Sequence, residues 1–425
     1  MIIEDIITQH AEDAAFLWLL RDSAVHEPHY DLKDLTELDN RVEAHLDGLR
    51  IAGDAGWEIC KDALIYEEPG EVFTAAVLAF TTNDQKRIDT VLDAGSNDPE
   101  LARAIISALG WFPWQEAEQH AATLAASESP QLRAIGLAAY AIHRQDPGRF
   151  LTEGISSTEP LIKAQALKAA GELGRADLLR IVQLHLQNED LKCRFYAAWS
   201  LVLLGHDESL PILQEIAESE SKYAEKACAT ALRIMPLDAG HAWLRDLSQK
   251  EQCARLSVLG AGVLGDPVAV PWLIQTMEVP ELARVAGESF SMIIGLDLAY
   301  EDLEGEWPED FEAGPTEDPD DEEVDLDPDE DLPWPEPALI AGWWEKNKGR
   351  FATGIRYLAG QLIAADHLKQ VLVSGLQRQR AAAAMELALL KPEQPLAETR
   401  APGFQQADQL RSEKGTIGKG DRFIF

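Results

Sequence analysis

The sequence predicts an all-α protein, an α-solenoid of short helix pairs, and three observations support this expectation. Alanine and leucine are abundant and aromatic residues make up 7% of the chain, a composition that favours helices over strands. The chain has 425 residues, of which 46% are hydrophobic, enough for an extended buried core. An apolar helical motif also recurs about every 30 residues through the middle of the chain.

Residues 1–66 are expected to form a helical cap that precedes the repeats. The segment AEDAAFLWLL has the pattern of an apolar helix, and LTELDNRVEAHLDGLRIAG has that of an amphipathic helix. The apolar stripe of the second segment consists of Leu35, Leu38, Val42, Leu46 and Leu49. A solenoid needs such a cap because its first repeat would otherwise expose an apolar face.

Residues 67–300 contain the repeats, and clear copies are DPELARAIISALG at Asp98, SPQLRAIGLAAYA at Ser129 and PELARVAGESFSMIIG at Pro280. Most copies start with a capping residue, often followed by proline, and a second, shorter helix follows. When the copies are aligned, basic residues fall in register at steps of 30, 30, 31, 32, 29 and 29 residues. These residues are Arg103, Arg133, Lys163, Arg194, Lys226, Arg255 and Arg284.

This repeat resembles the short bacterial form of HEAT-like repeats, in which D-P-x-[LV]-R opens the inner helix of each pair. The resemblance implies that each basic residue bridges to an acidic cap of the neighbouring repeat, as part of a structural ladder. The alternative is a basic stripe that grips a phosphate backbone, as in HEAT-like DNA glycosylases. That role needs basic side chains on a face free of acids, and the formal net charge of −37 disfavours it.

Residues 301–337 form an acidic insertion that ends in DPDDEEVDLDPDEDLPWPEP. From Glu301 to Glu336 there are 19 acids and no lysine or arginine, about half of the net charge of −37. Such a density of like charge predicts a solvated, flexible loop. An EF-hand calcium loop is the alternative interpretation. However, Glu330 stands where that loop requires glycine, and Pro333 and Pro335 block the helix that should leave it.

Residues 338–392 are expected to add one more helix pair, with Arg380 near the basic position and AAAAMELALL as the inner helix. The aromatic residues Trp343, Trp344, Phe351 and Tyr357 belong either to the core or to a binding surface. The tail, 393–425, is polar, and we expect it to be mobile unless its final FIF docks on the body.

The insertion and the tryptophans near it are the predicted partner-binding region. Flanking prolines hold Trp334 in an extended frame that can lie in a groove of this solenoid or of a partner. A strongly acidic surface attracts basic proteins and repels nucleic acids and anionic membranes, so we expect a basic protein partner and neither of the others. The predicted contacts are Asp325, Asp327, Asp329, Asp331, Trp334, Trp343 and Trp344.

The remaining motifs supply no catalytic, metal-binding or cofactor-binding residue. His26 and His29 of HEPH have no third ligand nearby in sequence, and GTIGKGD lacks the complete phosphate-loop pattern. The N-terminus carries acids where a signal peptide needs basic residues, so we expect a cytoplasmic protein. Four cysteines lie far apart in apolar helical patterns typical of small buried residues: Cys60, Cys193, Cys228 and Cys253.

Several landmarks outside the repeats resemble a proteobacterial family of HEAT-repeat proteins. In chain order they are QHAEDAAFLWLLRDSAV, LTELDNRVEAHLDGLRIAG, IIGLDL, DEDLPWPEP followed by WW, GRFATGIRYLAG and RQRAAAAMELAL. The family has no assigned activity, and its members are often encoded beside type VI secretion genes. With the acidic charge, this resemblance leads to the hypothesis of a non-enzymatic adaptor, chaperone or immunity protein for a secreted effector or tip component. The alternatives are an enzyme or cofactor-handling HEAT protein with a site in the concave groove, and a nucleic-acid mimic.

Overall fold

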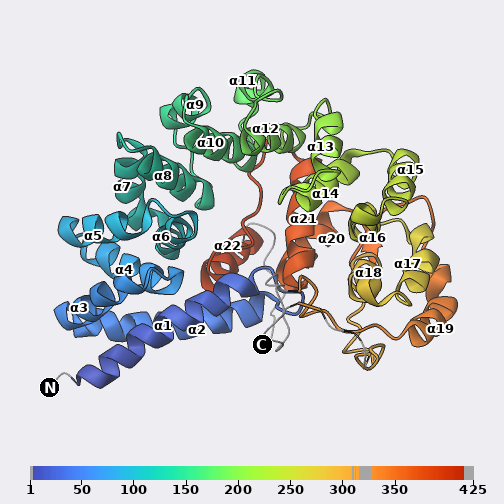
Figure 1. The fold of residues 1–425 in the computed structure, drawn as a ribbon, viewed down its shortest axis with the longest axis horizontal. Coiled ribbons are helices and arrows are strands. Elements are labelled where there is room, and N and C mark those ends of the chain that lie inside the picture. Colours follow the sequence, from blue (N-terminus) through green and yellow to red (C-terminus); the bar gives the residue numbers. More distant parts are fainter. Residues whose placement is uncertain (1–2, 309–310, 312, 315–326, 416–425) are drawn as a thin grey trace, which may run out of the picture. The chain divides into compact units, whose positions relative to one another are not determined.

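The computed structural model describes residues 3–308, 311, 313–314 and 327–415, the last six of these without their side chains. It confirms the predicted fold class, because the described chain is an all-α solenoid of helix pairs with an N-terminal helical cap (Figure 1). The chain forms two compact units, Met1–Gly205 with Lys391–Phe425 and His206–Leu390, which are described separately. The five segments delimited in the sequence remain predictions about sequence regions.

The first unit begins with three cap helices and continues with helix pairs. In its described residues the elements are α1 (Glu4–Ala24), α2 (Leu32–Ala52), α3 (Asp54–Ala63), the 3-10 helix η1 (Leu64–Tyr66), α4 (Pro69–Thr82), α5 (Gln85–Gly95), α6 (Pro99–Trp111), α7 (Trp114–Ala125), α8 (Pro130–Ile142), α9 (Arg149–Ile155), α10 (Pro160–Glu172), η2 (Ala176–Leu178), α11 (Leu179–Gln183), α12 (Leu191–Leu203) and α22 (Gly403–Gly415). Inner helices α4, α6, α8, α10 and α12 pack side by side in that order, and α5, α7, α9 and α11 are the outer helices (Figure 1).

The repeat motif explains where the inner helices begin. The side chains of Asp98, Ser129 and Asp190 accept hydrogen bonds from backbone N–H groups in the first turns of α6, α8 and α12. Pro99 and Pro130 follow two of these caps, at the first helical position, where a backbone N–H would have no acceptor within the helix. The capping residues and prolines that mark the repeats in the sequence therefore also set the helix starts.

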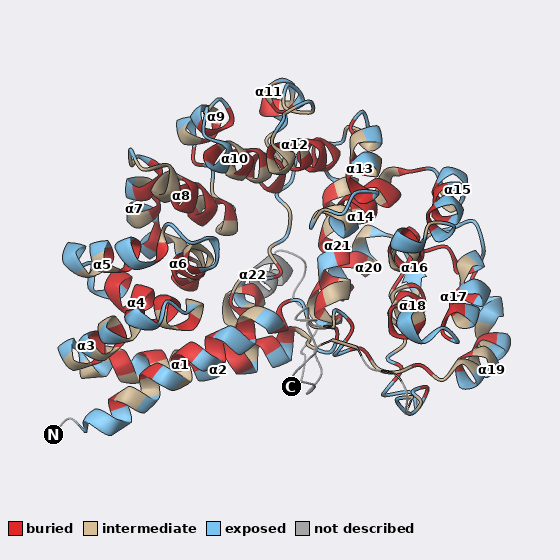
Figure 2. Cartoon of the chain, in the orientation of Figure 1, coloured by how far each residue is buried: buried red, intermediate tan, exposed pale blue. Residues whose placement is uncertain are grey.

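An aromatic row forms part of the core of the first unit. Trp18 of α1 stacks on Phe73 of α4, with 4.8 Å between ring centroids. Phe73 in turn meets Trp111 of α6 edge-on at 5.2 Å. All three side chains are buried, and buried residues line the faces where helices meet in each unit (Figure 2). The cap is thereby continuous with the core of the repeats.

The second unit contains the later repeats and the C-terminal helices. In its described residues the elements are α13 (Leu210–Ala217), α14 (Ala224–Ile234), α15 (Leu237–Ser248), η3 (Glu251–Cys253), α16 (Ala254–Leu264), η4 (Pro267–Ala269), α17 (Val270–Thr276), α18 (Pro280–Ile294), α19 (Pro337–Asn347), η5 (Lys348–Arg350), β1 (Tyr357–Leu358), β2 (Gln361–Leu362), α20 (Ala365–Ser374) and α21 (Gln377–Leu390). Inner helices α14, α16 and α18 pack in sequence order, α13, α15 and α17 are outer helices, and α20 packs on α21.

Buried serines join consecutive inner helices in both units. Ser200 of α12 donates from Oγ to the Leu167 carbonyl of α10 at 2.7 Å. Ser289 of α18 donates in the same way to the Val258 carbonyl of α16 at 2.9 Å. A Cβ added at Gly171 of α10 would lie only 2.8 Å from the Cα of Ser200, so the helices approach at a residue without a side chain.

A small β-hairpin in the second unit was not predicted from the sequence. Tyr357–Leu358 and Gln361–Leu362 pair in antiparallel register. Ala359 and Gly360 between them have φ of 46° and 81°, and positive φ at both central residues suits the twist of a tight hairpin. Their N–H groups donate to carbonyls at the end of α18, at 2.7 and 3.1 Å. Strands of two residues are too short to show an alternating pattern.

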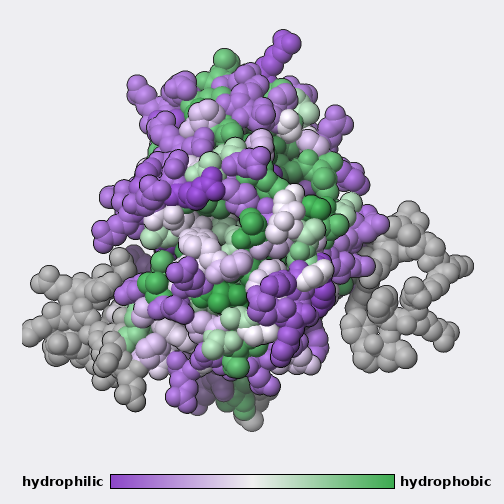
Figure 3. Space-filling model, turned by 90° about the vertical axis from the view of Figure 1, so that its right-hand side faces the viewer, coloured by the Kyte–Doolittle hydropathy of each residue, from purple (hydrophilic) through white to green (hydrophobic). Residues whose placement is uncertain are grey.

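In the second unit, apolar side chains remain exposed on the side where α15, α17 and α19 lie, a face that mixes hydrophilic and hydrophobic residues (Figure 3). Trp272 of α17 and Leu339 of α19 are among the exposed apolar residues.

In the part of the chain that the structure describes, no helix combines the length and the apolar content needed to cross a bilayer.

Candidate protein-binding surfaces

The basic residues of the repeat lie near the N-terminal ends of the inner helices. Arg103, Arg133, Lys163 and Arg194 belong to α6, α8, α10 and α12, and Lys226, Arg255 and Arg284 to α14, α16 and α18. Arg255 donates to Glu225 of α14 at 3.0 Å, the contact between neighbouring repeats that the ladder hypothesis describes. Arg103 pairs with Asp22 of cap helix α1, and Arg194 donates to the Asn188 carbonyl just before its own helix. A common ladder role stays a prediction.

Arg284 anchors the acidic insertion to the inner helices of the second unit. Its side chain is 4% exposed, and Nη1 lies 2.6 Å from Oδ2 of Asp327 and donates to the Asp329 carbonyl at 2.7 Å. The buried carboxylate of Asp329 accepts from Nη2 of Arg255 at 2.6 Å. The prediction of a solvated charge run is therefore wrong for Asp327 and Asp329, because two inner helices supply guanidinium groups that neutralise them.

Aromatic rings of the insertion surround the guanidinium group of Arg284. Its Cζ lies 4.7 Å from the ring centroid of Trp307, 5.7 Å from that of Trp334 and 5.8 Å from that of Phe311. The rings also contact one another, with 5.1 Å between the centroids of Trp307 and Trp334. A cation enclosed in this way gains up to about 2 kcal/mol from the ring quadrupoles. We call this arrangement the arginine clamp, which consists of Arg284, Trp307, Phe311, Asp327, Asp329 and Trp334.

Backbone hydrogen bonds tie the two ends of the insertion together. Gly305 N–H donates to the Trp334 carbonyl at 2.8 Å, and Glu336 N–H donates to the Leu303 carbonyl at 2.9 Å. These bonds bring both tryptophans of the clamp to one place. The predicted contact Asp325 belongs to 315–326, outside the described residues.

The other predicted contact residues have different surroundings. Asp331 is exposed, and Trp343 of α19 is partly exposed with its ring edge-on to Phe290 of α18 at 6.1 Å. Trp344 is buried, and its ring lies 5.7 Å from that of Phe351. The sequence left four aromatic residues open as either core or binding-surface residues. Three of them, Trp344, Phe351 and Tyr357, are buried and belong to the core of the second unit.

The geometry of the clamp suits guanidinium recognition better than calcium binding. Asp327 and Asp329 would be metal ligands in an EF-hand loop, yet here their oxygen atoms accept from Arg284 and Arg255. A cation would have to displace the buried guanidinium group of Arg284 and the partly exposed one of Arg255 from these carboxylates. Carboxylates combined with aromatic rings are a chemistry that binds arginine side chains.

A second candidate surface lies in the first unit, where residues Pro392–Gln406, which we call the C-terminal strap, cross the ends of the inner helices (Figure 1). Leu396 N–H donates to the carbonyl of Glu172, the last residue of α10, at 2.8 Å. Gln405 Nε2 donates to the carbonyls of Gly110 and Trp111 at the end of α6, at 3.3 and 3.0 Å. The last carbonyls of a helix have no donor within the helix, so the strap satisfies them.

Arg144, which follows α8, holds the middle of the strap. Its Nε donates to the Leu396 carbonyl at 2.6 Å, and its Nη2 lies 2.9 Å from Oε2 of Glu398. Nη1 donates to the Ala141 carbonyl at 2.5 Å. One guanidinium group thereby joins the end of α8 to both the main chain and a side chain of the strap.

A buried ion pair holds the far end of the strap. Nε of Arg21 on α1 donates to Oδ1 of Asp39 on α2 at 2.9 Å, and both residues are buried. Arg21 Nη2 also donates to the Arg400 carbonyl at 2.6 Å, and Asp39 Oδ2 accepts from Gly403 N–H at 2.5 Å. A Cβ at Gly403 would lie 2.8 Å from the backbone of Thr36, so this position requires glycine. The ion pair therefore binds the strap through its main chain.

The expectation of a mobile tail is wrong for the strap, and the reason is that distant residues hold its backbone. A partial signal was present in the sequence, since Phe404 follows glycine in an otherwise polar segment, and its ring meets Trp111 edge-on at 5.7 Å. The final FIF, whose docking was the alternative to a mobile tail, lies outside the described residues.

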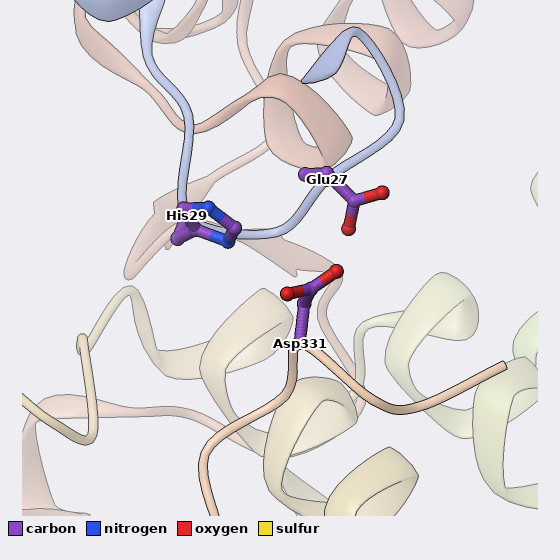
Figure 4. Close-up of side chains that lie close together, drawn as sticks. All are labelled: Glu27, His29 and Asp331. Carbon is purple, nitrogen blue, oxygen red and sulfur yellow. The ribbon is translucent and has the colours of Figure 1, made fainter. Parts of the chain in front are cut away.

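The histidines of HEPH belong to the first unit. Figure 4 draws His29 with Glu27 and Asp331. Glu27 and His29 belong to one unit and Asp331 to the other, and the placement of the units relative to one another is not determined, so these residues define no site.

A cavity of about 240 Å³ lies between α1, α3 and α4 in the first unit, lined by Cys60, Tyr66 and Glu71 among others. Burial raises the pKa of Glu71, and it raises the pKa of the Cys60 thiol to about 12. The cavity is smaller than the roughly 300–1,000 Å³ of typical ligand pockets, and a neutral thiol is a poor nucleophile. It is a weaker candidate than the clamp or the strap.

One comparison with known proteins agrees with the repeat architecture. Residues 148–233 match the family model for HEAT repeats, which commonly mediate protein binding. A crystal structure of an engineered protein from the Northeast Structural Genomics Consortium is similar at 16% identity and a TM-score of 0.30, over 68% of this chain and 95% of that chain. That likeness is too low to support an argument. No curated protein matches the chain significantly.

Proposed function

We propose that the protein is a non-enzymatic protein-interaction scaffold that binds a basic partner in the cytoplasm. Its role would be that of an adaptor, chaperone or immunity protein for a type VI secretion-linked effector or tip component. The acidic charge of the insertion carries the proposal. The clamp supports it, because carboxylates and aromatic rings of the same insertion bind the guanidinium group of Arg284. The HEAT-repeat match supports a scaffold, and the secretion link rests on the resemblance of the non-repeat landmarks to the proteobacterial family.

The proposed contact for the partner is the acidic run from Glu317 to Asp325. By sequence it contains seven acids and no lysine or arginine. Asp327 and Asp329, which follow it, are neutralised by arginines of the same unit. A concentrated negative charge of this kind accelerates association with a basic protein, and the effect weakens as salt screens it.

The test neutralises the acids from Glu317 to Asp325 by changing them to asparagine or glutamine. This variant keeps Asp327 and Asp329, so Arg284 stays paired, whereas a deletion of the insertion would leave that buried cation alone. The matched control neutralises seven exposed acids of outer helices, Glu116 and Glu118 among them.

Each form of the protein is used to retain proteins from the native host at low ionic strength, and the retained proteins are identified by mass spectrometry. Binding of the most abundant basic protein among them is then measured directly. The wild type and the control should retain it, while the insertion variant and high salt should release it. The proposal fails if the insertion variant retains the same proteins as the wild type.

A further inference from the structure

We propose that the strap groove of the first unit, formed by the C-terminal ends of α6, α8 and α10 with Arg21, Asp39 and Arg144, is a binding site for a segment of a partner protein that follows the path of the C-terminal strap. The C-terminal strap is its intramolecular occupant. This inference goes beyond the proposed function, because it concerns the other unit and a ligand of different chemistry.

The groove binds the strap mainly through the main chain. Arg144 and Arg21 donate to the carbonyls of Leu396 and Arg400, and Asp39 accepts from Gly403 N–H. Main-chain contacts of this kind fix the path of the bound segment while accepting many side chains, as in other modes of peptide recognition. Arg21 and Asp39 are themselves buried, so the strap meets fixed, desolvated groups rather than mobile surface side chains.

Three strap residues define the side chains that a competing segment should carry. Glu398 pairs with Arg144 at 2.9 Å, so an acid is required there. Gly403 leaves no space for a Cβ, and the ring of Phe404 packs edge-on against Trp111. The expected ligand is therefore a peptide with the pattern E-x-x-x-x-G-F, which starts a helix at the glycine as the strap does at Gly403.

The strap mixes exposed residues with four buried ones, Thr399, Pro402, Gly403 and Gln406. Leu396 and Phe404 are only partly buried, and Pro395, Ala397 and Arg400 are exposed. Local opening of a segment that buries little apolar surface costs less free energy than unfolding of the whole unit. While it is tethered, however, its effective concentration at the groove is in the millimolar range, so a free peptide competes poorly unless the strap is weakened.

The experiment uses the full-length protein with Gly403→Val, which sets a branched side chain against Thr36 and weakens the strap in place. A fluorescently labelled peptide with the sequence of residues 392–409 is titrated and followed by anisotropy. It should bind the variant at least about tenfold more tightly than the wild type, because the tethered competitor is weakened. The same peptide with Gly403→Val should bind neither protein, and adding Arg144→Ala to the variant should weaken binding about tenfold.

Equal binding to wild type and variant, or no binding to a variant that keeps its helical circular dichroism, would overturn the proposal. Hydrogen exchange of the wild type gives an independent measurement. Amides of Leu396 and Gly403 should exchange faster than those in the middle of α8 and α10, and equal protection would refute an exchangeable strap. None of these measurements involves the insertion.

Discussion

Replacement of Arg284 by methionine tests the clamp directly. Arg284 is 4% exposed and the side chain of its partner Asp327 is 9% exposed, so methionine would leave a buried carboxylate without a counter-charge. Loss of one member of a buried pair costs about 3–5 kcal/mol. The contacts with Trp307 and Trp334 would also lose their cation, although methionine keeps part of the packing. We therefore expect the unfolding free energy of the second unit to fall by about 3–4 kcal/mol.

The assay is urea unfolding followed by circular dichroism and tryptophan fluorescence, within a double-mutant cycle that includes Asp327→Asn. The double variant removes both charges, so its loss should be smaller than the sum of the two single losses by about 2 kcal/mol. Arg245→Ala, at an exposed position of α15, is the control and should change stability by less than about 0.5 kcal/mol. A loss below about 1 kcal/mol for Arg284→Met, or strictly additive single losses, would refute the reasoning.

Three further predictions concern the units themselves. Gly265 has a φ of 74°, and a Cβ there would collide with the Tyr357 carbonyl, so Gly265→Ala should destabilise by about 2 kcal/mol or more in thermal unfolding. Gly342→Ala, in open space on α19, should instead stabilise by up to about 1 kcal/mol. Burial raises the pKa of three thiols to about 12, so mass spectrometry should detect their alkylation only after unfolding: Cys60, Cys193 and Cys228. Burial lowers the pKa of three histidines of the first unit: His120, His143 and His185. The unfolded chain then binds more protons below about pH 6.5, so the melting temperature should decrease from about pH 7 to 5, and a constant value would contradict their burial.

The repeat architecture could be predicted because its signals are local. Asp98 and Ser129 cap their helices through bonds to residues two or three positions later, and the prolines that follow fix the first turn. Apolar spacing then specifies which face of each helix is buried. The basic residues fall near the inner-helix starts for the same reason, since their register follows from the helix caps.

The clamp could be predicted only in part. Charge and flanking prolines predicted Asp327, Asp329 and Trp334 as contacts for a partner, which stays a prediction, and the repeat alignment singled out Arg284 independently. That these residues meet one another is a tertiary fact, because 45 positions separate Arg284 from the Asp329 carbonyl that it binds. A charge run looks solvated in sequence whenever its counter-charges come from distant helices.

The sequence by itself determined the helices, their pairing into repeats, the cap and the strong negative charge, all of which depend on composition and on neighbours a few residues apart. Only the tertiary structure decided where the insertion and the strap bind. Gly403 donates to Asp39 across 364 positions, and Arg21 donates to the Arg400 carbonyl across 379. A contact between the main chain and a distant buried side chain leaves no periodic or compositional pattern in the sequence. Such contacts can be recognised only in the folded protein, where the inner helices bring these groups together.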